Sequence, residues 1–455
     1  MSKIKKSGLA WPEWIRITLI PFVALILFYA VEDMRGYLAL SAAKEQLLKE
    51  GFRLDREDYS HSGIPDRDNF AASKIFREIH SGNREFLREE DLPDPQRNSL
   101  SEINPHGFRG SDEALEDYFD PEVDRAEAIS MLRKQLSKAE SRMKDWEMAV
   151  ARPGIDWAAV GNPIDLDVSL SVTLYQATRR AFSAKARLAF AQGDSASAAA
   201  SVSVLLRTSR FAMTEQNLFG YVIGSLNARM SIAEVATGLE SQIWNSEELT
   251  LILNDLNDIR ENFGRKSVYE VEAATTIADS DDLWEQRKQY GNYVDMMGLH
   301  LLDLPDYLVG IDTEPLENFL NKWVYLIPRG WFWLHHADYL RSISSYEKGE
   351  SWFQKYPLSE SLFESADFEG LLRRIKQTEI LVDFASLACE LELFYLENDS
   401  YPAVEDFRPD STSFRYTIGK NGRPVLWYSE DAMADSNLVP DDFEAIAEPF
   451  LWLYP

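Results

Sequence analysis

The chain has 455 residues, 45% hydrophobic and 12% aromatic, which is enough for a substantial core and for two or three domains. Its 75 acidic and 47 basic residues leave a formal net charge of −28, so the surface repels phosphate backbones, and nucleic acid is not expected as a partner. A single cysteine, Cys389, rules out an internal disulfide and a zinc site built from several cysteines, and its place on an apolar helical face indicates a core residue.

The N-terminus has the pattern of an uncleaved membrane anchor. Lysines precede an uninterrupted apolar run from Ile17 to Val31, and Trp14 and Ile15 lengthen that run enough to cross a bilayer. The acidic sequence after the run lacks the small residues of a cleavage site, which favours an anchor over a cleaved or interfacial segment. We expect a transmembrane helix at residues 15–35 of an inner-membrane protein. The positive-inside bias places residues 1–14 in the cytoplasm and the bulk of the chain in the periplasm, or otherwise outside the cytoplasm.

Residues 36–119 are predicted to be a membrane-proximal helix followed by an irregular region. Leucines and alanines recur at helical spacing from Gly36 to Phe52, which predicts that the helix continues past the anchor. From Arg53 to Tyr118 the sequence is polar and interrupted by proline and glycine, which is typical of loops with short helices.

Residues 120–260 are predicted to form a body of antiparallel helical hairpins. Asp120 and the proline after it supply a helix cap, and the turn at Pro153 ends the helix that follows. The next helix breaks at Gly193, and Asn245 with a glutamate three residues later forms a capping-box-like start. Apolar stripes predict packing between helices of the same chain, with dimerisation through the first of them as an alternative. That first stripe comprises Ile129, Leu132, Leu136, Ala139, Met143, Trp146 and Val150.

Residues 261–369 are predicted to be helical and contain the most aromatic part of the chain. Basic residues and a proline interrupt the aromatic stretch, so a second membrane span is disfavoured and a core or domain interface is expected. The histidines lack metal-ligand spacing, and the chain has no nucleotide-binding loop or hydrolase elbow, so we predict no catalytic residue, cofactor or metal site. The alternatives are a membrane-surface patch, or a ligand or enzyme pocket near Trp331, Trp333, His335 and His336.

Residues 370–455 are predicted to be a small α+β module made of a long helix and a β-hairpin. The helix has one apolar face and ends at Asn398, and Pro402 prevents its resumption. Two short β-type runs between Phe414 and Ser429 flank a glycine-rich turn. Helix, Tyr-Pro, loop and hairpin in this order resemble the globular half of type II secretion pseudopilins. That resemblance implies calcium binding after the hairpin, but a solvated acidic loop is favoured for the acids there, Asp431, Asp435, Asp441 and Asp442.

Several short segments together resemble an uncharacterised family of bacterial single-pass membrane-anchored helical proteins. They are the basic start and span, IPDRDNFA from Ile64, IWNSEELTLILNDL from Ile243, PRGWFWLHHADYL from Pro328, and the helix with its Tyr-Pro end. The resemblance implies no activity and no site residue. We therefore expect a mainly α, membrane-anchored, non-enzymatic protein that binds other proteins as an envelope scaffold. The alternatives are an accessory component of a type II secretion or pilus-like assembly, and an enzyme or ligand-binding protein that uses the aromatic pocket.

Overall fold

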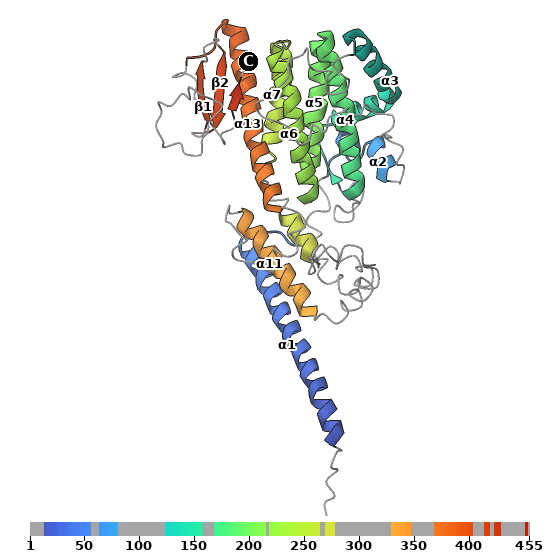
Figure 1. The fold of residues 1–455 in the computed structure, drawn as a ribbon, viewed down its shortest axis with the longest axis vertical. Coiled ribbons are helices and arrows are strands. Elements are labelled where there is room, and N and C mark those ends of the chain that lie inside the picture. Colours follow the sequence, from blue (N-terminus) through green and yellow to red (C-terminus); the bar gives the residue numbers. More distant parts are fainter. Residues whose placement is uncertain are drawn as a thin grey trace, which may run out of the picture. The chain divides into compact units, whose positions relative to one another are not determined.

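The computed structural model describes residues 13–55, 63–80, 123–157, 168–214, 218–263, 269–277, 329–347, 368–403, 414–418, 423–428 and 451–453. Over these residues the chain is mainly helical, as predicted, with a small antiparallel sheet near its C-terminus (Figure 1). It divides into two compact units, and each is discontinuous in sequence. The first unit comprises residues 1–58 and 269–368, and the second comprises residues 59–268 and 369–455.

The first unit is organised around α1 (Glu13–Lys49), which runs without a break from the predicted anchor into the membrane-proximal segment. Helix α11 (Arg329–Glu347) lies along the C-terminal half of α1 (Figure 1), and residues 269–277 are also helical. The predicted continuation of one helix beyond residue 35 is confirmed. Its small and aliphatic residues recur at helical spacing and so face one common core. That core contains Leu40, Ala43, Leu47, Phe52, Tyr269, Ala273, Ala337, Leu340 and Ile343.

Polar contacts close the edges of this core. The Tyr339 hydroxyl donates to Glu272 Oε1 at 2.7 Å, and burial, with the adjacent carboxylate, raises the pKa of Tyr339, so the phenol stays a donor. The Ser344 hydroxyl donates to Glu50 Oε2 at 2.6 Å, near the C-terminal end of α1. The first contact joins α11 to the helix at residues 269–277, and the second joins α11 to the end of α1.

The second unit contains most of the described helices. They are α2 (Lys74–His80), α3 (Arg125–Val150), α4 (Val168–Gln192), α5 (Ser195–Met213), α6 (Leu218–Glu240), α7 (Ser246–Arg260) and α13 (Phe368–Asn398). Helix α5 contacts α3, α4, α6 and α7, so it is the central helix of the group, and Figure 1 shows these helices side by side.

Helix boundaries in the second unit follow capping signals in the sequence. Asp194 caps α5 after the turn at Gly193, and Asn245 with Glu248 forms a complete capping box on α7, as predicted. Hydrogen bonds from the side chain and then the backbone N–H of Ser197 lower the pKa of Asp194, as expected for a capping carboxylate. Helix α3 begins later than the prediction: its cap is Asp124, which accepts from two backbone amides, and the proposed cap at Asp120 lies outside the described residues.

The core of the second unit combines the predicted stripe of α3 with aromatic residues from other segments. The stripe is buried from Leu132 to Val150, and Ile129 is partly buried, so the prediction that it packs within the chain is confirmed. Phe70 stacks on Phe211 with centroids 4.3 Å apart. Trp146 donates its indole N–H to Thr208 Oγ1 at 2.9 Å, which satisfies the polar atom of a fully buried tryptophan.

Ion pairs link the helices of the second unit, and the sequence analysis did not anticipate them. Asp255 on α7 is almost completely buried and accepts from Arg207 Nε at 2.9 Å and from the Ser203 hydroxyl, both on α5. Burial raises the pKa of Asp255, and these donors oppose the rise. Arg260 on α7 pairs with Asp383 on α13 at 2.9 Å, so the C-terminal helix is joined to the helical body.

The C-terminal strands form a three-stranded antiparallel sheet in the order β1-β2-β3. The predicted hairpin is confirmed as β1 (Phe414–Ile418) paired with β2 (Pro424–Tyr428), whereas β3 (Leu451–Leu453) was not predicted. Phe414 meets Phe384 of α13 edge to face, so the sheet packs on that helix. Cys389 is fully buried, and burial raises the pKa of its thiol, in agreement with a core residue.

Candidate functional site

The most unusual surface of the protein is the N-terminal half of α1. From Ile20 to Val31 every residue is exposed apart from the half-buried Tyr29, and the exposed fraction reaches 68% at Ile20 and 67% at Phe22. Since an α-helix has 3.6 residues per turn, consecutive exposed positions cover its whole circumference. The apolar side chains therefore surround the helix instead of forming one stripe.

Packing on α1 starts one residue beyond this run. Gly36 and Gly330 of α11 face each other so closely that a Cβ at either position would overlap backbone atoms of the opposite helix, with Gly330 O as the obstacle for one and Glu32 O for the other. Glycine is required here because only a residue without a side chain permits this approach. From this crossing the two helices run alongside each other, and Arg341 donates to Ala39 O at 3.4 Å further along.

The two acids that follow the apolar run have partners on α11 and on α1 itself. Asp33 Oδ1 accepts from Gly330 N at 2.7 Å, where its charge also complements the positive N-terminal end of α11. Glu32 Oε2 accepts from the Trp331 indole N–H at 2.9 Å and pairs with Arg35 at 3.4 Å. Both carboxylates are thus engaged at the helix crossing.

The aromatic residues of the predicted pocket have different environments. Trp331 is 48% exposed, whereas Trp333 is partly buried, meets Tyr37 edge to face at 5.9 Å, and has the Arg329 guanidinium 4.5 Å from its ring centroid. His336 is buried, and burial, with Lys44 nearby, lowers its pKa to about 4, so the ring is neutral at pH 7. The side chain of His335 lies outside the described residues. The described part of this segment contributes to the apolar core of the first unit, which agrees with the expected core rather than a pocket, and Trp331 is exposed beside it.

Among the helices of the described ranges, none is both long enough and apolar enough to cross a bilayer. In the same part of the chain, no group of His, Cys, Asp or Glu side chains converges as metal ligands do. The acids of the predicted calcium loop, Asp431, Asp435, Asp441 and Asp442, lie outside the described residues.

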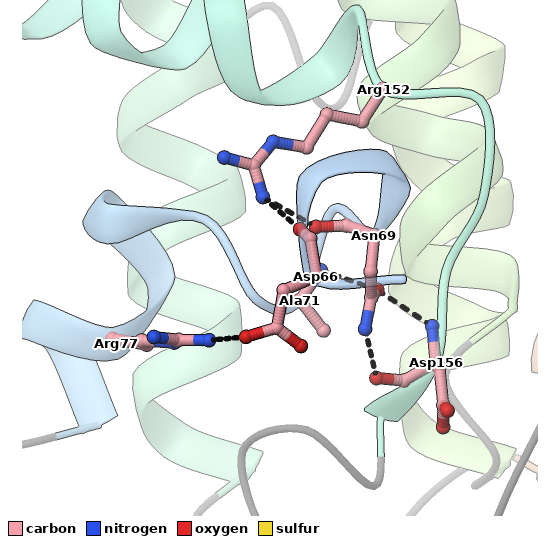
Figure 2. A network of polar contacts seen from close by, with 6 residues as sticks. All are labelled: Asp66, Asn69, Ala71, Arg77, Arg152 and Asp156. Atoms are coloured by element: carbon pink, nitrogen blue, oxygen red, sulfur yellow. Dashed lines mark hydrogen bonds and ion pairs between the residues drawn. The ribbon is translucent and has the colours of Figure 1, made fainter. Parts of the chain in front are cut away.

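The segment IPDRDNFA forms a structural clip (Figure 2). The buried Asn69 side chain accepts from Ala71 N at 3.1 Å and from Asp156 N at 2.8 Å, and it donates to Asp156 O at 2.9 Å. Arg152, just after α3, donates to the carbonyl oxygens of Asp66 and Asn69 at 2.8 and 2.7 Å. These polar groups all have hydrogen-bond partners within the fold. The role of the segment is therefore structural: it attaches the chain before α2 to the end of α3.

A groove of about 370 Å³ lies between α3 and α4. Its floor is apolar, and its rim carries both signs of charge, including the Lys185–Glu147 pair at 2.5 Å. Such a surface can accept an amphipathic segment, because the floor buries apolar side chains while the rim pairs with charges. The apolar part comprises Leu136, Met143 and Leu188, and the charged part includes Arg133, Glu140 and Lys144.

Comparisons with known proteins do not assign this site. No family model, no curated protein and no solved structure matches the chain.

Proposed function

We propose that the protein is a membrane-anchored scaffold that binds other proteins outside the cytoplasm, with residues 15–35 as the span in the inner membrane. The observation that carries the proposal is the apolar surface around α1 from Ile20 to Val31. A protein partner would contact part of the circumference, whereas lipid surrounds a helix on all sides, so an apolar helix exposed all round fits a bilayer.

No described helix meets the length and apolarity of a span, so the proposed span also draws on the sequence ahead of Ile20. The run from Ile20 to Val31 rises about 18 Å, and residues 15–35 rise about 30 Å, close to the hydrocarbon thickness of a bilayer. The backbone of α1 is helical from Glu13 onward, so the added residues continue the same helix. The uncleaved orientation, with residues 1–14 in the cytoplasm, follows from the basic residues ahead of the run.

A charge placed in the run tests the anchor. Ile26→Arg puts a guanidinium near the middle of the proposed span, which costs about 3 kcal/mol on insertion scales. We expect the variant to leave the membrane pellet on alkaline carbonate extraction, while the wild-type chain stays. Met148→Arg is the matched control, because Met148 is also an exposed apolar side chain, 57% exposed, but belongs to α3. Release of the wild-type chain, or full retention of Ile26→Arg, contradicts the anchor.

The groove between α3 and α4 supports the scaffold function. We propose that the antiparallel helical-hairpin body presents this groove to a protein partner. A photo-crosslinking amino acid at Lys144, on the rim, should give discrete adducts in intact cells. The same residue at Asn254, exposed on α7, should give none. The same crosslinked adducts from both positions, or no adduct from Lys144, would count against the groove as the binding surface.

A second candidate function, an accessory role in a type II secretion or pilus-like assembly, is supported by the end of α13. Phe394, Tyr395 and Leu396 are exposed there in succession, next to the sheet of the pseudopilin-like module. Exposed apolar residues of this kind often mark an interface. Phe394→Glu with Leu396→Glu should abolish co-purification with pseudopilin-type subunits, whereas Met131→Glu on α3 should not. Unchanged co-purification removes this candidate.

A further inference from the structure

The packed part of α1 begins where its exposed apolar run ends. Gly330, at the start of α11, contacts Asp33 and the backbone at Glu32, and α11 then runs away from the apolar run toward Glu50. The first turn of α11 is therefore level with the end of the run. Glu32 lies only about 1.5 Å of helix rise beyond Val31.

The side chains at this level are those that favour a bilayer interface. The Trp331 indole is about half exposed and has an apolar ring with a polar N–H, and Arg329 stacks on Trp333 beside it. Tryptophan is enriched at the headgroup level of membranes, and arginine can extend its charge toward phosphates while its stem stays in apolar surroundings. Arg35, 62% exposed, adds a second cation at the same level.

The acids at the junction do not oppose such a contact. Asp33 is bound to the N-terminal end of α11, and Glu32 accepts from Trp331 and pairs with Arg35. Each carboxylate therefore has a local positive partner, which reduces its repulsion of lipid phosphates. This differs from the chain as a whole, whose net charge of −28 disfavours anionic surfaces.

We propose that the first turn of α11 is a second membrane contact, in which Trp331 enters the phospholipid headgroup layer beside the anchor and sets the depth of the first unit. This inference rests on the proposed anchor. The partner is the headgroup layer itself, and because the indole supplies the contact, no particular lipid charge is required.

Spin-label depth measurements test the proposal on the full chain in phospholipid nanodiscs. Single labels are placed at Ile26→Cys, Met34→Cys and Met148→Cys in a Cys389→Ala background that keeps Trp331. Met34 is exposed and follows Asp33, so it reports the level of the first turn of α11. Accessibility to oxygen and to a water-soluble nickel complex is measured. We expect Ile26 to be protected from nickel, Met148 to be fully accessible, and Met34 to lie between them. The intermediate depth should be the same in zwitterionic and in partly anionic bilayers.

The outcomes separate this proposal from the anchor. If Ile26 is protected while Met34 is as accessible as Met148, the anchor stands and the headgroup contact is overturned. If Ile26 is as accessible as Met148, both are overturned. A label at Leu38→Cys, read with and without Trp331→Ala, tests the indole itself. Loss of the indole should raise nickel accessibility there, and an unchanged value would overturn its role.

Discussion

The two units of this protein hold their helices together in different ways. In the first unit, α1 and α11 meet backbone to backbone at Gly36 and Gly330, and a helix end is capped by Asp33 from the neighbouring helix. In the second unit, large aromatic side chains and buried ion pairs such as Arg207–Asp255 fill the space between helices. The first arrangement adds to its apolar core a contact that requires the absence of a side chain at two positions, whereas the second spreads its free energy over many side-chain contacts.

The largest expected effect comes from filling the glycine crossing. Gly36→Ala places a Cβ against the Gly330 carbonyl group, which must separate the helices, and we expect a loss of about 4 kcal/mol in the stability of α11 docking. Hydrogen exchange of α11 amides measures it. Gly193→Ala is the control, because a Cβ there meets open space and the positive φ of 67° costs only about 1 kcal/mol. Unchanged exchange in α11 would mean that the crossing is not tight.

An intermediate effect concerns pH and is also specific to the first unit. The pKa of His336 is about 4 in the folded chain and about 6.5 when exposed, so the folded state binds fewer protons between these values. Neutral, buried His336 therefore makes its full contribution to the free energy of unfolding above pH 6.5. That contribution falls by about 3 kcal/mol as the pH decreases to 4, so the first unit becomes less stable.

His336→Gln removes this titration, so the free energy of unfolding of the variant should lack the pH dependence that His336 contributes to the wild-type protein. Denaturant unfolding of both proteins across pH 4 to 7 measures their free energies of unfolding. The exposure of α11 serves as the signal for unfolding of the first unit. Because carboxylates also titrate near pH 4, the comparison is the wild-type value minus the variant value at each pH. A constant difference would show that His336 does not change its protonation on unfolding.

A smaller effect is expected at the clip of the second unit. Asn69→Ala leaves buried backbone groups of Ala71 and Asp156 without their partner, and we expect a loss of about 2 kcal/mol. Asp66→Ala removes only an exposed pair with Arg77 and should cost below about 1 kcal/mol. Thermal unfolding of both variants measures the difference, and equal losses would contradict the role of Asn69.

Local signals allowed much of the fold to be predicted. The cap at Asn245, the break at Gly193, the stripe of α3 and the hairpin of β1 and β2 each depend on residues close in sequence. β3 depends instead on pairing with the free edge of β2, and its three residues carry too little pattern to predict alone. The burial of Asp255 likewise depends on donors from another helix.

In the candidate site, too, some features could be predicted from the sequence and others depend on the tertiary structure. Sequence alone determined the apolar run and its basic flank, because hydrophobicity along one helix needs no partner to be recognised. It also identified the aromatic segment around Trp331, but could not tell a pocket from an interface. Only the tertiary structure decided that Gly330 meets Gly36 and that Trp331 is level with the end of the run, since that contact joins residues about 300 positions apart through backbone shape. Amino-acid patterns encode local helices and turns, whereas such a contact is set by how whole helices pack.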